Sequence, residues 1–163
     1  MVNSKAVRAN LLDASVLVKN FVKEKGSNIL EKYLRNETIL YTTPFCFYEA
    51  LNVLKMKWLR KEICKQDYLS NSFSIIGWFL QTSHGIKDID LFSPTVLGEV
   101  KKIVDRYQLD LSDALQIISV KYGRFSKLVV DSRTVLITAD KRLAEVAKDE
   151  CILSWYVMEG SPP

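Results

Sequence analysis

Ala9-Asn10-Leu11-Leu12-Asp13-Ala14-Ser15-Val16-Leu17-Val18 is the stretch that decides the fold of this chain. Its first part is a short apolar run that ends at Asp13, a pattern typical of a buried strand. The apolar residues that follow recur at helical spacing, which predicts a helix over Ser15 to Val22. A strand that passes at once into a helix is the repeating unit of α/β folds.

The rest of the chain continues this alternation of strands and helices. The predicted elements are a helix near Ile29 to Leu34, a strand over Thr38 to Thr42, helices from Pro44 to Trp58 and from Asp67 to about Thr82, a strand over Ile86 to Leu91, helices from Pro94 to Tyr107 and from Ser112 to about Tyr122, a strand over Thr134 to Ile137, a helix over Lys141 to Lys148 and an edge strand over Ile152 to Val157. Such alternation implies parallel pairing, so we expect a three-layer α/β/α sandwich with a central parallel sheet of four to five strands. Leu128-Val129-Val130 fits either an extra strand or an insertion.

The bulk composition fits one domain of ordinary size. The 163 residues are 48% hydrophobic and 26% charged, as expected for a globular protein with a sizeable core. The net charge of +4 and the pI of about 8.9 are mildly basic. That balance suits a polyanionic partner, but it suits a lysine-rich surface equally well.

Cysteine and histidine are too scarce to carry the chemistry. The three cysteines are dispersed and His84 is the one histidine, so neither a zinc site nor Ser-His-Asp or Cys-His catalysis is favoured. Dispersed thiols are typical of core packing in a reducing compartment, so we expect a cytoplasmic protein.

The uncharged stretch Tyr68 to Ile86 raises the question of a membrane span. Its continuous apolar part, Ile75 to Leu80, is too short to cross a bilayer, so we interpret it as a buried helix. Near the N-terminus, Leu11-Leu12 is interrupted by Asp13, so no signal-peptide core is expected.

Two acids directly follow predicted strands. Asp13 follows Asn10-Leu11-Leu12, and Asp140 follows Val135-Leu136-Ile137-Thr138-Ala139. Ligands of open α/β sheets bind beyond the carboxyl ends of the strands. Aspartate is also a common helix N-cap, so each acid suits either role.

Three further acids lie on helices or at their starts. Glu49 is the only charged residue between Glu37 and Lys55, so it is expected to be partly buried and to need a cation, a strong donor or a salt bridge to an arginine. Asp110 and Asp113 flank a predicted helix start, where the helix dipole favours negative charge. Carboxylates from separate elements make sense together around a divalent cation, because Mg²⁺ and Mn²⁺ prefer hard oxygen ligands. The predicted chemistry is hydrolysis by a metal-activated water.

Four short motifs in this order resemble the PIN-domain nucleases, and especially the VapC-type toxins and their archaeal relatives. The motifs are Leu11-Leu12-Asp13-Ala14-Ser15, Tyr48-Glu49-Ala50-Leu51, Asp110-Leu111-Ser112-Asp113-Ala114 and Thr138-Ala139-Asp140. The resemblance implies a single PIN-like domain over residues 1–163 that cleaves single-stranded RNA with Mg²⁺ or Mn²⁺. It also implies the roles of individual residues: Asp13, Glu49, Asp113 and Asp140 as the catalytic, metal-binding acids, Asp110 as an additional acid, Ser15 and Thr138 as orienting hydroxyls, and Lys141 and Arg142 as RNA contacts.

Partners and alternative functions follow from the same resemblance. A toxin needs an antitoxin, and the apolar helices Phe45 to Trp58 and Tyr68 to Leu80 would provide a groove for one, pack on each other, or form a homodimer interface. The basic residues around Trp58 (Lys55, Lys57, Arg60 and Lys61) offer phosphate contacts, but Trp58 keeps core spacing, which favours a solvated helix face. The alternative function is a catalytically inactive PIN-like scaffold or RNA-binding module. Phosphatases of the haloacid-dehalogenase type need Asp-x-Asp where this chain has Asp13-Ala14-Ser15, and the acid and lysine pattern of receiver domains is not met.

Overall fold

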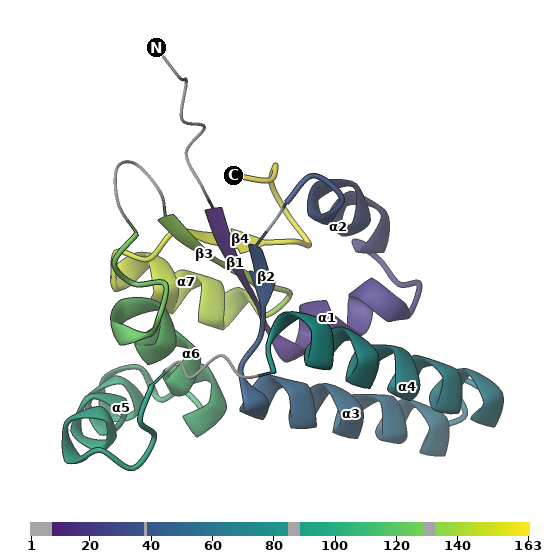
Figure 1. Ribbon diagram of the computed structural model, residues 1–163, viewed down its shortest axis with the longest axis horizontal. Helices are drawn as coiled ribbons and strands as arrows, with labels where there is room; N and C mark the ends of the chain where they lie inside the picture. The colour runs from purple at the N-terminus through teal and green to yellow at the C-terminus, as the bar shows by residue number, and fades with distance from the viewer. Residues whose placement is uncertain (1–7, 38, 85–88, 129–132) are drawn as a thin grey trace.

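The computed structural model describes residues 8–37, 39–84, 89–128 and 133–163, and within them strands alternate with helices (Figure 1). In chain order the elements are β1 (Arg8–Leu12), α1 (Ala14–Phe21), α2 (Ser27–Leu34), β2 (Ile39–Tyr41), α3 (Pro44–Leu59), α4 (Lys65–Thr82), α5 (Pro94–Tyr107), α6 (Leu111–Tyr122), β3 (Arg133–Thr138), α7 (Lys141–Asp149) and β4 (Ser154–Tyr156). These bounds confirm most of the predicted elements to within two residues.

The sheet has four parallel strands in the order β2-β1-β3-β4, which confirms the predicted α/β/α class. The two central strands, β1 and β3, are the longest and largely apolar, as expected for strands covered on both faces; the buried Asn10 of β1 is an exception, and it bonds to Tyr33 and Glu37. From β1 the chain goes first to β2 on one side, and it later returns to β3 on the other side. The carboxyl ends of β1 and β3 therefore form a switch point, where open α/β sheets bind ligands.

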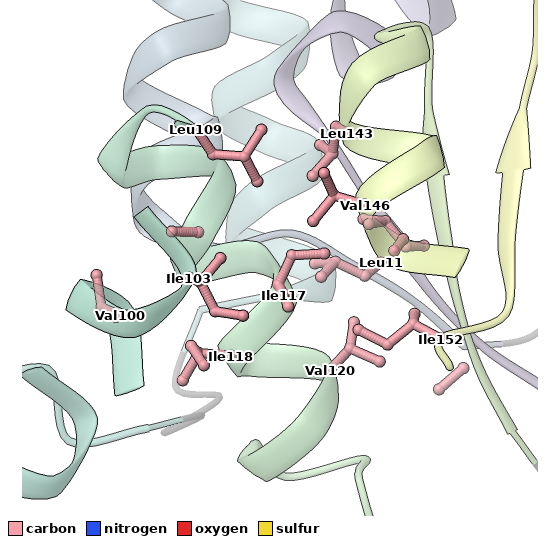
Figure 2. Packing of buried hydrophobic residues seen from close by; sticks show 14 of the residues in the cluster. Leu11, Val100, Ile103, Leu109, Ile117, Ile118, Val120, Leu143, Val146 and Ile152 are labelled. Atoms are coloured by element: carbon pink, nitrogen blue, oxygen red, sulfur yellow. The ribbon is translucent and has the colours of Figure 1, made fainter. Parts of the chain in front are cut away.

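Side chains alternate between the two faces of the sheet, and each face has its own core. Ala9, Leu11 and Leu136 pack with α6 and α7, while α5 packs against α6 (Figure 2). Leu12 and Ile137 face the opposite way and pack with α1 and α2. Because side chains alternate along a strand, β1 and β3 each supply apolar side chains to the cores on both faces of the sheet.

A third apolar cluster joins α3 and α4 to α1, beside the sheet (Figure 1). The two helices contact each other, one of the arrangements expected for them. The prediction of a buried helix after Tyr68 was wrong: Ile75 is the only buried residue of α4, and Phe73 is 74% exposed. A helix at the margin of a domain buries only one stripe of its surface, so the lack of charged residues in α4 does not mean that the helix is buried. Among the helices of the described chain, none is long and apolar enough to span a membrane.

Two other expectations need correction. The strand predicted over Ile86 to Leu91 is absent from residues 89–91, which form no strand, and its remaining residues lie outside the described part. Alternation of apolar and charged residues favours a strand only where a sheet edge is available. Cysteine packing was right only for Cys46, which is buried, whereas Cys64 and Cys151 are exposed; all three are free thiols. Val129 and Val130, whose structure the pattern left open, also lie outside the described residues.

Candidate active site

A groove of about 430 Å³ opens at the switch point, beyond the ends of β1 and β3. Its walls come from α1, α3, the start of α6 and the turn between β3 and α7. The acids that line it are Asp13, Glu49, Asp110, Asp113 and Asp140. The structure thus brings all five acids singled out in the sequence to one place.

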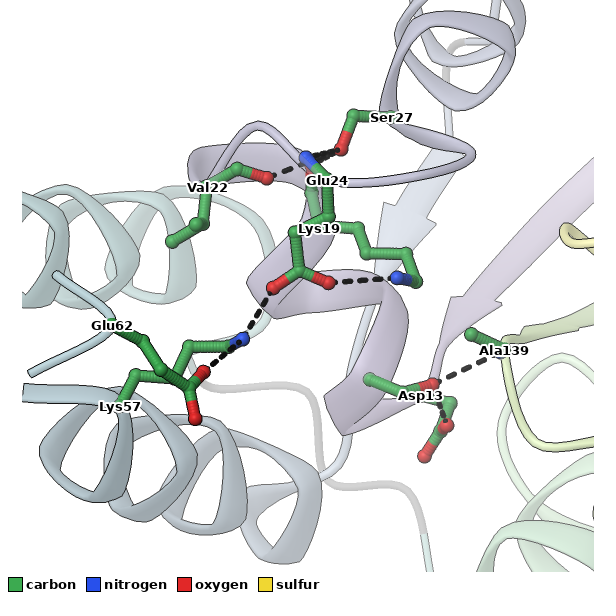
Figure 3. Close-up of polar contacts among 9 residues, drawn as sticks. Asp13, Lys19, Val22, Glu24, Ser27, Lys57, Glu62 and Ala139 are labelled. Atoms are coloured by element: carbon green, nitrogen blue, oxygen red, sulfur yellow. Dashed lines mark hydrogen bonds and ion pairs between the residues drawn. The ribbon is translucent and has the colours of Figure 1, made fainter. Parts of the chain in front are cut away.

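The Asp13 carboxylate is buried and held in one orientation by its neighbours. Its Oδ1 accepts a hydrogen bond from the Ala14 backbone N–H at 2.7 Å. Its Oδ2 accepts from the hydroxyls of Ser15, at 2.5 Å, and Thr138, at 2.8 Å. The Ser15 hydroxyl also accepts from the Ala139 backbone N–H, which ties α1 to the end of β3, and Figure 3 shows Ala139 beside Asp13. The Thr138 hydroxyl accepts from the Asp140 backbone N–H within the turn between β3 and α7. This is the geometry required of orienting hydroxyls, the role predicted for Ser15 and Thr138.

Gln116 is a site residue that sequence reasoning missed. It lies fully buried on α6, and its Nε2 donates to Asp13 Oδ1 at 2.9 Å and to Asp113 Oδ1 at 3.4 Å. Its Oε1 has no partner among the described residues, so the amide is oriented by the two carboxylates alone. A glutamine between Leu115 and Ile117 in an apolar segment was the available signal, because a buried amide needs a polar partner.

Asp113 bears most of the electrostatic cost of this arrangement. Burial raises its pKa to about 7, and the nearby negative charges of Asp13, Asp140, Glu49 and Asp110 contribute to the same rise. The carboxyl group therefore holds its proton about half the time near neutral pH. A site with this pKa takes up a cation readily, because a cation stabilises the ionised form.

Glu49 departs from its predicted environment. The residue is exposed along the groove, although its neighbours shield part of the carboxylate from solvent, and no arginine of the described chain forms an ion pair with it. Its pKa is raised by loss of solvent around the carboxylate and by the charge of Asp13, while a hydrogen bond from Ser112 acts in the opposite direction. Glu49 lies on α3 and lines the groove together with Asp13, whereas the buried residues of the same helix pack with α1 and α4.

The helix-capping interpretation of the aspartates also holds, alongside their place in the groove. Asp13 caps α1, and Asp140 caps α7 by accepting from the Leu143 backbone N–H at 3.0 Å. Asp110 stands at the N-cap position of α6 without a side-chain capping bond. Helix N-termini favour negative charge, which helps these acids to stay together.

Two lysines line the groove, and neither is among the RNA contacts that the resemblance implies. Lys141 and Arg142 are exposed and do not line the groove, and Arg142 donates instead to the Tyr107 carbonyl at 3.0 Å. Lys19 and Lys57 line it in their place. In the part of the chain that the structure describes, no ion pair joins a lysine or arginine to any of the five acids.

The donor set suits a hard divalent cation. Across the described residues, no group of three His, Cys, Asp or Glu side chains is arranged to hold a metal ion by itself. Mg²⁺, however, keeps several of its waters and commonly takes only one or two carboxylates from a protein. Asp13 and Asp113, joined through Gln116, supply such a pair. A bound cation would offset the burial and the repulsion between acids that raise the pKa of Asp113.

Comparisons with known proteins bear on the fold and the family of the chain. The chain is similar to the crystal structure of PAE2754 from Pyrobaculum aerophilum, with 22% sequence identity over 92% of each chain and a TM-score of 0.60. That likeness concerns the fold. No curated protein matches the sequence. The family model described as PIN domain matches residues 11–149, from the end of β1 to the end of α7. This match covers every acid of the groove, and the chain belongs to the PIN-domain family, a family of nucleases.

Proposed function

We propose that this chain is a divalent-metal-dependent endoribonuclease that hydrolyses phosphodiester bonds of single-stranded RNA. The observation that carries the proposal is a set of acids that have no cationic partner among the described residues, in which the pKa of Asp113 reaches about 7. A structural cluster of this kind would destabilise the protein, whereas a site for Mg²⁺ or Mn²⁺ has a use for it.

Each residue of the groove has a task in this proposal. Asp13 and Asp113 would be the cation ligands, because hydrogen bonds from Gln116 fix their positions. Glu49 and Asp140 add further negative charge to the same groove. When bound, a divalent cation supplies Lewis acidity and a bound water of lowered pKa. Ser15 and Thr138 keep the Asp13 carboxylate from rotating, and Gln116 keeps it at a fixed place relative to Asp113. Asp113 must release its proton before it can bind a cation, so cation binding releases protons to the solvent near neutral pH.

The groove, at about 430 Å³, has the size of an ordinary small-molecule site, large enough for one nucleotide. The preference for a single strand comes from the family resemblance. The preference for RNA over DNA comes from the resemblance to the VapC-type toxins, so the test must include both polymers.

The same proposal extends to a toxin restrained by an antitoxin, with a homodimer as the functional unit. The exposed apolar side chains of α3 and α4, among them Phe45 and Phe73, would be the surface for such partners. Induced expression in a bacterial host should arrest growth, and the Asp13→Asn variant at the same level should not. Equal growth with both proteins would remove the toxin part and leave the nuclease part standing.

The nuclease activity is tested with a labelled pool of single-stranded RNA and a matched DNA pool, each with Mg²⁺ or Mn²⁺ and with or without EDTA. Asp113→Asn serves as the inactive variant, and its folding is checked by circular dichroism. Cleavage of RNA that is abolished by EDTA and by the substitution supports the proposal. A folded wild-type protein that neither binds Mn²⁺ nor cleaves would favour the alternative, an inactive PIN-like scaffold or RNA-binding module.

A further inference from the structure

Away from Asp13, the groove is lined by two lysines that share one glutamate. Lys19 and Lys57 both line the groove, as does Glu24, which lies between them (Figure 3). The Lys19 Nζ is 2.8 Å from Glu24 Oε2, and the Lys57 Nζ is 2.7 Å from Glu24 Oε1. The carboxylate of Glu24 thus holds two ammonium groups at one place on the groove wall.

Two helices deliver these lysines from the acidic end. On α1, Lys19 follows Ser15 by one helical turn, and on α3, Glu49, Val53 and Lys57 form one stripe along the groove. Eight residues of helix span about 12 Å, so Lys57 is anchored well away from Glu49. An anion at these lysines is therefore a different group from one that is held at the acids.

The two ammonium groups have hydrogen-bonding capacity to spare. An ammonium carries three N–H donors. Within the described chain, the Lys19 Nζ has one partner, Glu24. Its side chain is only 10% exposed, so water has little room to satisfy the remaining donors. Lys57 has one further partner, Glu62 Oε2 at 3.2 Å, which lies on the more exposed side. Glu24 itself stays ionised: loss of solvent raises its pKa, but the hydrogen bonds from Lys19 and Lys57 outweigh this and lower it.

We infer that Lys19 and Lys57 form a second phosphate subsite, which holds the backbone phosphate of a nucleotide neighbouring the scissile bond. Glu24 is a positioning residue that keeps both ammonium groups directed along the groove. The inference rests on the proposed function, since it assigns the direction in which a strand lies: one phosphate at the acids, the next towards the lysines. A purely structural ion pair between the α1–α2 connection and α3 is the competing explanation.

The salt dependence of binding separates these two explanations. Each phosphate contact to a single strand contributes about 0.7 to the slope of log affinity against log salt concentration. In the Asp113→Asn background with Mg²⁺, where cleavage is prevented, Lys57→Met should lower this slope by about 0.7 and Lys19→Met by a similar amount. The matched control is Lys121→Met: Lys121 is also paired to a carboxylate, Glu150, at 2.5 Å, but lies in a different pocket. Its slope should equal that of the parent.

A modified substrate gives an independent measurement. A single methylphosphonate next to the scissile bond removes one charge from the strand, and it should weaken binding by the parent protein but not weaken binding by Lys57→Met further. Unchanged slopes for both groove variants, with RNA still bound, would overturn the subsite and leave the proposed function intact. Absence of RNA binding and cleavage in every protein, wild type included, would overturn both. Lys57 is the more exposed of the two lysines, so its variant keeps the test valid if Lys19→Met does not fold.

Discussion

The two ends of helix α7 carry acids in opposite electrostatic settings. At its start, Asp140 belongs to a cluster of acids that has no cationic partner among the described residues. At its end, Glu150 accepts hydrogen bonds from Lys121 Nζ at 2.5 Å and from the Tyr107 hydroxyl at 2.7 Å, with Arg106 close by. These bonds lower the pKa of Glu150, whereas burial and like charges raise the pKa of Asp113 to about 7. Glu150 thus has cationic partners, as an acid that serves the fold should have. The acids of the groove have none among the described residues, as acids that bind a cation would.

The largest effect is expected from removing the best-held acid of the groove. Loss of a hydrogen-bonded partner behind a metal ligand commonly costs 10–100-fold, so Asp13→Asn, which removes the ligand charge itself, should lower cleavage by at least about 100-fold. The side chains are nearly isosteric, so the fold should persist. Initial cleavage rates with Mn²⁺, beside a circular dichroism spectrum, make the measurement; wild-type rates in the folded variant would refute the assignment.

The next effect separates the positioning of the acids from their charge. Gln116→Leu removes the amide that joins Asp13 to Asp113 and should weaken Mn²⁺ binding by about 10–100-fold. Because it also removes an unpartnered buried Oε1, the free energy of unfolding should change much less than the metal affinity. Calorimetric titration and urea unfolding measure the two quantities. Equal losses in both would mean that Gln116 serves the fold alone.

The paired end of α7 should show the reverse behaviour. Glu150→Gln weakens charge-assisted hydrogen bonds of a largely buried carboxylate and should lower the free energy of unfolding by about 1–3 kcal/mol. Cleavage per folded molecule should not change. A loss of cleavage larger than the loss of folded protein would show that the two ends of the helix are coupled.

The smallest effect concerns pH in the metal-free protein. The folded state retains the Asp113 proton up to about pH 7, whereas the unfolded chain releases it near the ordinary carboxyl pKa. The folded state therefore binds more protons between these two pKa values, and stability should fall as the pH rises from about 4 to 7. Asp113→Asn should flatten this fall and be the more stable protein at pH 8, by about 1–2 kcal/mol after allowance for partial solvation. Urea unfolding in EDTA at several pH values tests this; a steeper fall for the variant would contradict the assigned sign.

Sequence patterns were most informative where one rule acted alone. The apolar runs of β1 and β3, the helical spacing of α5 and the caps of α1 and α7 needed no knowledge of neighbours, and all were confirmed. The patterns failed where a neighbour decides the outcome. Nothing in the sequence around Glu37 indicates that it is half-buried and accepts a hydrogen bond from Asn10 Nδ2 at 3.0 Å. The strand expected over Ile86 to Leu91 does not form at residues 89–91, where the chain is irregular and then turns.

The acids of the site were visible in the sequence because each stands next to a structural signal: a strand end for Asp13 and Asp140, a helix start for Asp113. Their number and order, together with the family resemblance, determined the chemistry to look for. Only the tertiary structure decided which polar side chains join them. Two of these contacts join residues that are far apart in the sequence: Gln116 of α6 bonds to Asp13, and Glu24 pairs with Lys57 of α3. Glu24 also pairs with Lys19 of α1, so the roles of these residues depend on how α1, α3 and α6 pack. Local patterns report which face of an element is buried, whereas the identity of the opposing residue depends on how the elements pack.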